Sequence, residues 1–273
     1  MENSMRYSMM SYTWSRQSNY FDLVKMLDQV VELKMAGVDF VTLHDKPAKE
    51  LRKMADDRGL PVVCHTFMAD MDFPTASERQ AGVDKAMRGI EAAKELGAPV
   101  VMIPTPGKRE GQRAVSRTNW IEGLKHVVPF GAKAGIAVSI ENFPGADSPF
   151  VIAADMLEAV RAVPGLKLTY DNGNAAGGEN PAFSFSRCAQ DVVHAHFKDW
   201  TIRPAGSTDG MLMLDGRRYV SALIGEGDVD QASCLAVMTA AGYAGCINIE
   251  YEGDKYRPDE ATCKAVEYLR HVE

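Results

Sequence analysis

Four short segments in the second half of the chain decide the fold: IAVSIEN (136–142), LKLTYD (166–171), VVHAHFK (192–198) and CINIEY (246–251). Each alternates apolar with polar positions, is rich in β-branched or aromatic residues, and carries a charged or amide residue at or near its end. Longer segments with apolar residues at helical spacing separate them, as is typical of parallel strands joined by helical crossovers. The segments therefore predict a run of consecutive βα units.

The first half of the chain continues this alternation, which brings the expected number of βα units to eight. An open doubly wound sheet is disfavoured because its dinucleotide-binding form needs GxGxxG after the first strand, and SYTWSR (11–16) offers none. With 273 residues, close to the roughly 250 that are typical of the fold, we expect one α/β domain over residues 1–273, a (β/α)₈ TIM barrel. The four strands expected in the first half are RYSMMSY (6–12), VDFVTLH (38–44), PVVCHT (61–66) and PVVMIP (99–104).

Helices are clearest where apolar residues recur at three and four positions. Gly37 and Gly97 are expected to end two of them, and Asp228 or Asp230 to cap the helix after the seventh strand. Residues 200–227 form a long connection, which in a compact domain is usually a functional lid or disordered. The clearest helical segments are 21–37, 76–97 and 260–272.

Composition and charge exclude several classes of protein. The formal net charge of −7 disfavours a nucleic-acid partner, because neutralisation of phosphate by Lys and Arg dominates such affinity. The sequence shows neither a signal-peptide pattern nor a long apolar segment, so we expect a cytoplasmic protein with no membrane partner. Five widely spaced cysteines without a CxxC pair indicate reduced thiols. A homo-oligomer remains possible.

Residue parity selects a candidate site. Side chains of a barrel strand alternate between the interior and the helix layer, so the apolar Val138 and Ile140 should face outward and Glu141 inward. The same sorting in the three later strands gives inward carboxylates or imidazoles near their C-terminal ends, where TIM-barrel active sites are built. The four candidates are Glu141, Asp171, His196 and Glu250.

Three crowded carboxylates repel one another, and a divalent cation reverses that electrostatic problem. Three oxygen ligands and one imidazole suit Mn²⁺, Mg²⁺, Co²⁺ or Zn²⁺, and the absence of thiolates disfavours an exclusively zinc site. The sequence therefore predicts one divalent cation, bound by these four residues.

The motifs around these residues resemble the sugar isomerase and epimerase superfamily. This group of xylose isomerase-like TIM barrels includes ketose 3-epimerases, hydroxypyruvate isomerases, inosose dehydratases and type IV apurinic endonucleases. The resemblance covers strands five to eight, whereas residues 1–130 match only in their βα rhythm. The motifs are SIENF (139–143), TYDNGN (169–174), HAHFKDW (194–200) with IGEGDVD (224–230), and INIEYEG (247–253).

The resemblance implies the same four metal ligands, with Glu141 and Glu250 doubling as acid and base. It implies a divalent-metal-dependent isomerase or epimerase of a sugar, keto-sugar or related polyol, working by proton transfer through a metal-stabilised enediolate. The family often has His three positions after the strand-six Asp, where this chain has Asn174. An amide hydrogen-bonds but cannot shuttle a proton near neutral pH.

Three other functions stay open. The same metal site is compatible with a keto-cyclitol or keto-sugar dehydratase or lyase. A phosphodiesterase of the type IV endonuclease kind is disfavoured because that enzyme needs three zinc ions, while the fourth strand here ends VVMIPT (100–105) without histidine. A non-catalytic sugar-binding subunit that keeps the metal is the third.

Five further residues are candidates for contacting the substrate. Asn174 takes the place of the family histidine. Lys198 and Arg203 follow the seventh strand and would orient a hydroxyl or anionic group, with a surface salt bridge as the alternative. His65 would line the pocket or serve as a structural histidine. Trp14 would form a sugar-facing wall or pack within a loop.

Overall fold

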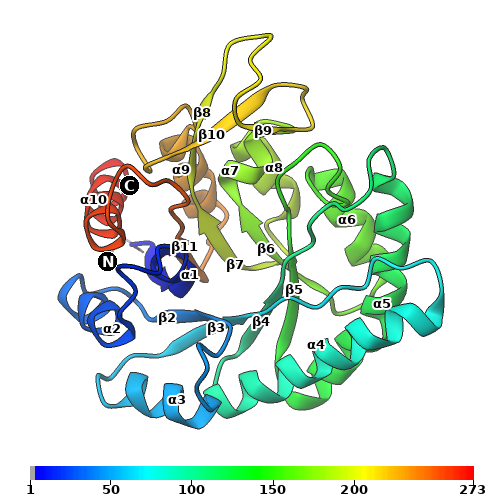
Figure 1. The fold of residues 1–273 in the computed structure, drawn as a ribbon, viewed down its shortest axis with the longest axis horizontal. Helices are drawn as coiled ribbons and strands as arrows, with labels where there is room; N and C mark the ends of the chain where they lie inside the picture. The colour runs from blue at the N-terminus through cyan, green and yellow to red at the C-terminus, as the bar shows by residue number, and fades with distance from the viewer. Residues whose placement is uncertain (1–3) are drawn as a thin grey trace.

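The barrel strands of the protein are short and parallel. The structure is a computed structural model, and it describes residues 4–273. They are β1 (Arg6–Met10), β2 (Val38–Val41), β3 (Val62–Thr66), β4 (Val100–Ile103), β5 (Ala137–Glu141), β6 (Lys167–Asp171), β7 (Val192–Phe197) and β11 (Cys246–Ile249). Around the closed barrel their order is β1-β11-β7-β6-β5-β4-β3-β2 (Figure 1). The predicted TIM barrel is confirmed.

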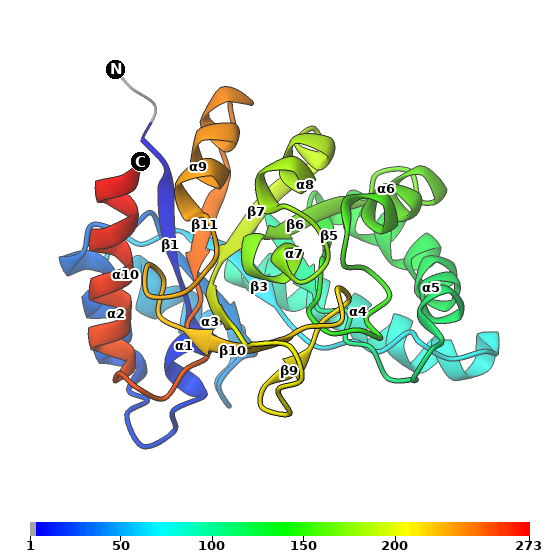
Figure 2. The same ribbon diagram turned by 90° about the horizontal axis from the view of Figure 1, so that it is seen from above.

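Helices between the strands surround the barrel (Figure 2). Two short helices differ from the rest, because they begin directly where a strand ends: α1 (Ser11–Ser15) after β1 and α7 (Asn172–Ala176) after β6. The remaining helices are α2 (Leu23–Glu32), α3 (Ala48–Asp56), α4 (Ala76–Leu96), α5 (Arg113–Ala134), α6 (Ala153–Ala162), α8 (Pro181–Cys188), α9 (Gln231–Ala240) and α10 (Pro258–Val272).

Local sequence signals set several helix ends. Thr75 and Glu78 form a capping box at the start of α4, each side chain accepting from the other's backbone N–H. Gly97 ends α4 in the left-handed conformation with φ of 72°, as predicted. Asp230 accepts a hydrogen bond from the backbone N–H of Ser233 and caps α9, which was also expected.

The prediction that Gly37 ends a helix is wrong. Helix α2 already ends at Glu32, and Gly37 lies just before β2. A Cβ atom at this position would come within 2.4 Å of the Pro61 carbonyl oxygen on the neighbouring strand. The glycine therefore permits close approach of two backbones at the start of the β2–β3 pair.

The first two strands are also shorter than predicted. The expected strand 6–12 stops at Met10 because the chain turns at once into α1. The expected strand 38–44 stops at Val41, and the following Thr42 takes a positive φ of 68° that is incompatible with a strand. Both strands therefore end in compact turns at the mouth of the barrel.

The strand parity read from the sequence holds in β5 and β6. Val138 and Ile140 belong to the large apolar core between barrel and helices. Ser139 and Thr169 instead point into the barrel, where their hydroxyl oxygens lie 2.7 Å apart. The barrel interior is thus partly polar, and the main hydrophobic core lies outside it.

The long connection after β7 contains a small antiparallel sheet, which we call the lid sheet. It consists of β8 (Asp199–Ile202), β9 (Met211–Leu212) and β10 (Arg218–Ala222), in the order β8-β10-β9. Trp200, Met213 and Tyr219 are buried against Val229 and form a core of its own. The lid sheet extends past the helices at the top of Figure 1, and Figure 2 shows it at the end of the barrel where α1 lies.

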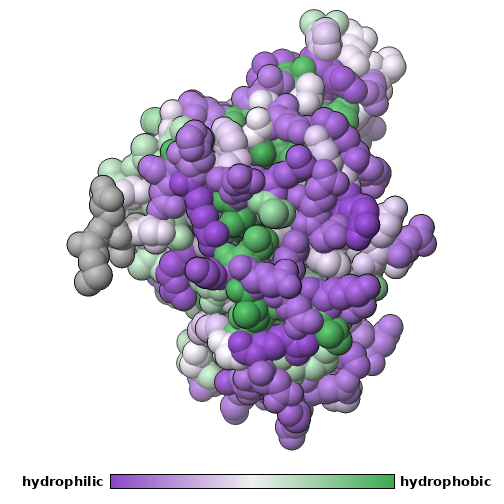
Figure 3. Space-filling model, turned by 90° about the vertical axis from the view of Figure 1, so that its left-hand side faces the viewer, coloured by the Kyte–Doolittle hydropathy of each residue, from purple (hydrophilic) through white to green (hydrophobic). Residues whose placement is uncertain are grey.

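The surface in Figure 3 is predominantly hydrophilic, with apolar residues gathered in a central group and a few smaller patches. In the part of the chain that the structure describes, none of the helices combines the length and apolar character that crossing a membrane would require.

Candidate metal centre

Four side chains converge at the mouth of the barrel. Glu141 and Asp171 are the last residues of β5 and β6, His196 lies in β7, and Glu250 follows β11 directly. Each brings one possible ligand atom to within 4.8 Å of the other three, and all four residues are buried. The fold thus assembles the four residues that the sequence singled out, and we call them the mouth cluster.

The imidazole of His196 turns one nitrogen toward the two glutamates. Its Nδ1 lies 2.7 Å from Oε1 of Glu141 and 3.4 Å from Oε2 of Glu250. Asp171 Oδ2 and Glu250 Oε2 are buried, and neither has a hydrogen-bond partner within residues 4–273. Buried carboxylate oxygens without partners are costly, so this donor set fits a bound cation.

A lysine adjoins the mouth cluster. Lys198 Nζ lies 3.0 Å from Oε1 of Glu250, 3.4 Å from Oδ2 of Asp171 and 3.5 Å from Oε2 of Glu252. Its side chain is only 6% exposed, so this ammonium group is held among three carboxylates rather than in solvent. Lys198 was predicted to contact the substrate, and the structure brings it to the site.

The electrostatics of the centre reflect this crowding. Burial, reinforced by the charges of Glu141 and Glu250, raises the pKa of Asp171 well above its usual value. Burial alone would also raise the pKa of Glu250, but Lys198 and His196 outweigh it and bring that pKa to about 2. Glu250 is therefore an ionised carboxylate at neutral pH.

Asn142 fixes the backbone that carries Asp171. Its Nδ2 donates to the Asp171 carbonyl oxygen at 2.7 Å, and its Oδ1 accepts from the Asp171 N–H at 2.8 Å. Asn174 completes this corner, since its N–H donates to Asp171 Oδ1 at 2.7 Å and its Nδ2 to the Asn142 carbonyl at 3.0 Å. Asn174 is therefore next to the mouth cluster, and its contact with the substrate stays a prediction.

A second amide pair fixes the backbone of Lys198. Its N–H donates to Oδ1 of Asn172 at 3.1 Å, and its carbonyl accepts from Nε2 of Gln231 at 3.0 Å. The next residue, Asp199, accepts hydrogen bonds from the backbone N–H groups of Gly225, Gly227 and Val229. Backbone N–H groups that converge in this way form a binding site for a negative charge, here the Asp199 carboxylate. The IGEGDVD segment is thus a turn fastened to β8 by Asp199.

Comparison with known proteins agrees with this architecture. The model of the family described as "Xylose isomerase-like TIM barrel" matches residues 23–272. The chain belongs to this family. Inosose dehydratase of Geobacillus thermodenitrificans is 25% identical over 257 residues, covering 86% of this chain and 85% of that protein. Inosose dehydratase of Lacticaseibacillus casei is 22% identical, covering 89% and 87%.

Solved structures share the fold at lower identity. A D-tagatose 3-epimerase-like protein superposes with a TM-score of 0.75 at 22% identity, covering 98% of both chains. D-allulose 3-epimerase from Methylomonas sp. superposes with a TM-score of 0.76 at 15% identity, covering both chains fully. These structures therefore share the barrel fold with this chain.

Three of the residues expected to contact the substrate stand outside the mouth cluster. Arg203 is on the lid sheet, where its Nη2 pairs with Oδ2 of Asp209 at 2.6 Å. Trp14 is 4% exposed and packs in the main hydrophobic core. His65 is buried and its Nδ1 lies 2.7 Å from the Phe40 carbonyl oxygen. None of the three joins the mouth cluster.

A cavity of about 580 Å³ lies at the ends of β1 and β2. Tyr12, Phe21 and His44 are among its lining residues. Burial raises the pKa of Tyr12, and the charges of Glu252 and Glu250 raise it further. Sequence reasoning missed Tyr12 because it assigned that residue to a strand.

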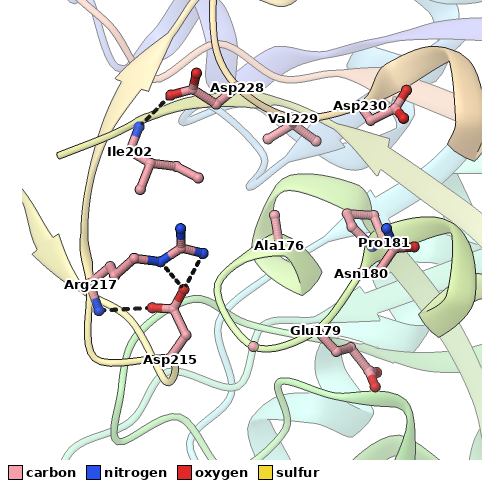
Figure 4. Close-up of a pocket in the computed structure, with 11 residues that line it drawn as sticks. Ala176, Glu179, Asn180, Pro181, Ile202, Asp215, Arg217, Asp228, Val229 and Asp230 are labelled. Carbon is pink, nitrogen blue, oxygen red and sulfur yellow. Dashed lines mark hydrogen bonds and ion pairs between the residues drawn. The ribbon is translucent and has the colours of Figure 1, made fainter. Parts of the chain in front are cut away.

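A second cavity, of about 350 Å³, lies between the lid sheet and helices α7 to α9 (Figure 4). The guanidinium of Arg217 points into it and pairs with Asp215, while Asp228 accepts from the Ile202 N–H. Its lining does not include any residue of the mouth cluster. It is a feature of the lid, separate from the candidate centre.

Proposed function

We propose that the protein is a divalent-metal-dependent isomerase or epimerase that moves a proton next to the carbonyl of a sugar, keto-sugar or related polyol. The observation that carries the proposal is the mouth cluster, in which two glutamates from separate strands reach one imidazole and two buried carboxylate oxygens lack partners among the described residues. Relatives named as epimerases and dehydratases support this class of substrate.

Glu141, Asp171, His196 and Glu250 would hold the cation. A bound divalent cation would supply Lewis acidity toward substrate oxygens and would compensate the carboxylate charge. Oxygen and imidazole donors without a thiolate suit Mn²⁺, Mg²⁺, Co²⁺ or Zn²⁺.

The two glutamates would carry the proton. β5 and β11 are separated in the barrel by β6 and β7, so Glu141 and Glu250 approach the centre from different sides. An epimerase needs this arrangement, because one carboxylate removes the proton from one face of the carbon and the other returns it to the opposite face. The low pKa of Glu250 provides an ionised base at neutral pH.

Lys198 and Asn174 would orient the substrate. The Lys198 ammonium is buried beside Glu250 and can donate hydrogen bonds to a substrate oxygen, which favours negative charge developing there. The side-chain oxygen of Asn174 is buried and without a partner in the described part of the chain, so it is available to accept from a substrate hydroxyl.

Loss of water from a keto-cyclitol or keto-sugar is the second candidate. The position of Lys198 favours it, since an ammonium group beside Glu250 can protonate a departing hydroxyl after the proton has been removed. The relatives named inosose dehydratase support the same reaction.

Solvent deuterium distinguishes these possibilities. We would incubate metal-loaded protein with a panel of ketoses and inososes in D₂O and analyse the products by NMR and mass spectrometry. Deuterium incorporated into an isomer supports the isomerase or epimerase, and an unsaturated product lacking one water supports the dehydratase. Absence of both across the panel contradicts the proposal.

Two variants test the assignment of the glutamates. Glu141→Gln and Glu250→Gln keep the size of the side chain, and each should lower activity by about 10²–10⁴-fold. Glu95→Gln, an exposed position on α4, is the matched control and should behave as wild type. Full activity in either of the first two would refute the acid and base roles.

A further inference from the structure

A second group of possible ligands lies inside the barrel. Asp39 of β2, Cys64 of β3 and His194 of β7 each bring one ligand atom to within 4.8 Å of the other two. His194 precedes His196 by two residues on the same strand, so it faces the barrel interior one layer further from the mouth. We call Asp39, Cys64 and His194 the interior cluster. It shares no residue with the mouth cluster.

The interior cluster joins opposite parts of the barrel. Asp39 and Cys64 are paired across the neighbouring strands β2 and β3. His194 comes from β7, whose neighbours in the barrel are β11 and β6. An ion bound by all three residues would therefore connect strands that do not pair with each other.

The interior cluster is closed off from solvent and holds unsatisfied ligand atoms. Asp39 and Cys64 are fully buried, and His194 is 1% exposed. Asp39 Oδ2 accepts hydrogen bonds from Thr66 Oγ1 and from Asn248 Nδ2, both at 2.8 Å. The other carboxylate oxygen, Oδ1, and Nε2 of His194 are buried, and neither has a hydrogen-bond partner within residues 4–273. Two such atoms in one buried cluster are costly unless a further group satisfies them.

The Asp39 carboxylate also lacks a permanent positive charge beside it. Among residues 4–273 its ion-pair partners are the imidazoles of His194 and His196, with Nε2 atoms 3.9 Å and 4.0 Å from Asp39 Oδ2. Neither a lysine nor an arginine in this part of the chain pairs with it. Buried carboxylates are normally paired or bound to a metal. A divalent cation at the interior cluster would supply the missing charge.

We propose that the interior cluster binds a second divalent cation, Zn²⁺. Zinc takes thiolate, imidazole and carboxylate ligands, and the thiolate selects it over Mg²⁺ and Mn²⁺. The Thr66 hydroxyl lies 4.0 Å from Cys64 Sγ and 2.8 Å from Asp39 Oδ2, where it can supply a fourth ligand. The mouth cluster has no sulfur, so the two sites differ in their preferred ion.

Binding exchanges a proton for the ion. Burial raises the pKa of the Cys64 thiol well above its usual value, so the metal-free site holds an S–H group. Coordination forms a bond between Sγ and the cation and releases the thiol proton to solvent, so binding strengthens as the pH rises. Because the interior cluster is buried, the ion would enter while the chain folds and would stabilise the barrel rather than take part in catalysis.

Cobalt reports this site selectively. Co²⁺ can replace Zn²⁺, and its bond to a thiolate gives a charge-transfer absorption band in the near ultraviolet that oxygen and nitrogen ligands do not give. The protein would be produced in zinc-depleted medium containing Co²⁺, so that the ion is present during folding, and then purified and dialysed. We expect a band corresponding to one thiolate-bound Co²⁺ per chain. Absence of the band would overturn the proposal.

Two cysteine variants locate the band. Cys64→Ser should abolish it and lower the cobalt content by one ion per chain. Cys263→Ser makes the same change at an exposed cysteine and is the matched control, which should keep the full band. A band that survives in Cys64→Ser, or is lost in Cys263→Ser, would overturn the proposal.

Asp39→Asn is the second ligand variant, and it decides the question if circular dichroism shows that Cys64→Ser does not fold. Asparagine has the same shape and can still accept from Thr66 and Asn248, but it lacks the charge. The band should therefore fall by about tenfold or more. An unchanged band would overturn the proposal.

Asp171→Ala separates the two sites, because it removes a ligand of the mouth cluster only. The thiolate band should remain in full, and its loss would overturn the proposal of an independent interior site. The total cobalt content should fall. If the band is present and Asp171→Ala retains all the cobalt of wild type, the proposed function fails while the interior site stands.

Discussion

The two halves of the barrel place different chemistry at its centre. β5, β6, β7 and β11 each contribute one residue of the mouth cluster. β1 and β4 instead contribute Met10 and Met102, which are buried in a small apolar cluster. From the first half, Asp39 of β2 places a buried carboxylate oxygen 4.0 Å from His196 Nε2. The second half therefore carries the proposed chemistry, and the first half lines the cavity at the ends of β1 and β2.

The largest effect should come from removing a ligand in the second half. Asp171→Ala takes away one of the four expected ligands, whose buried Oδ2 has no hydrogen-bond partner in residues 4–273. Mn²⁺ affinity should therefore fall further than the roughly 10–100-fold that loss of a supporting group costs. Asp84→Asn, on the exposed face of α4, is the control from the first half. Calorimetric titration measures the Mn²⁺ affinity of both variants. Equal affinities in Asp171→Ala and Asp84→Asn would contradict the difference between the two halves of the barrel.

The next effect in size is a loss of stability, which we expect from Asn142→Ala. This change leaves the N–H and the carbonyl of Asp171 without their partners in a buried corner, at about 1–3 kcal/mol of unfolding free energy for each group. Urea unfolding of the metal-free protein measures the loss. Asn180→Ala, which removes an exposed helix cap of α8, should cost about 1 kcal/mol and serves for comparison.

The mouth cluster was predictable because strand parity is a local property. In β5 and β6 every second residue faces inward, so the sequence alone placed Glu141 and Asp171 on one face. Glu252 lies three residues past the end of β11, so parity does not reach it, and only the structure shows that it approaches Lys198. Asn142 follows the end of its strand, where alternation no longer governs direction, so only the folded turn shows that it holds Asp171.

The lid sheet and the role of Gly37 could not be predicted from the sequence, because both depend on contacts between residues that are distant along the chain. Strand β9 has only two residues, too few for any periodicity, and it forms because β10 pairs with it. The need for glycine at position 37 arises from the Pro61 carbonyl on the adjacent strand. Arg203 was expected at the substrate because it follows the seventh strand, and the structure shows it directly after β8, paired with Asp209.

A pH-dependent effect should distinguish the first half. Burial lowers the pKa of His44 to about 4 from its usual value of 6.5. Between these two values the unfolded chain binds a proton that the folded chain does not, so this residue's contribution to stability is present above pH 6.5 and is lost as pH falls toward 4. His44→Gln should reduce the acid-induced loss of stability by roughly 1–2 kcal/mol, after allowance for partial exposure.

The measurement is urea unfolding of both proteins at pH 7 and at pH 4.5. The exposed His126→Gln on α5 is the control for removal of a histidine. A parallel loss of stability in wild type and His44→Gln would show that the cavity at β1 and β2 does not exclude a charged imidazole.

The smallest effect is expected on the lid sheet, which belongs to the second half but not to the mouth cluster. Arg203→Gln breaks the pair with Asp209, whose side chain is 66% exposed, so the free energy of unfolding should change by less than about 1 kcal/mol. Mn²⁺ affinity should stay at the wild-type value, because Arg203 does not contact the mouth cluster. A large rise in KM with unchanged Mn²⁺ affinity would show that the lid sheet moves over the cavity during turnover and that Arg203 then reaches the substrate. In that case the lid sheet would act in substrate binding during turnover, whereas the mouth cluster would act in metal binding.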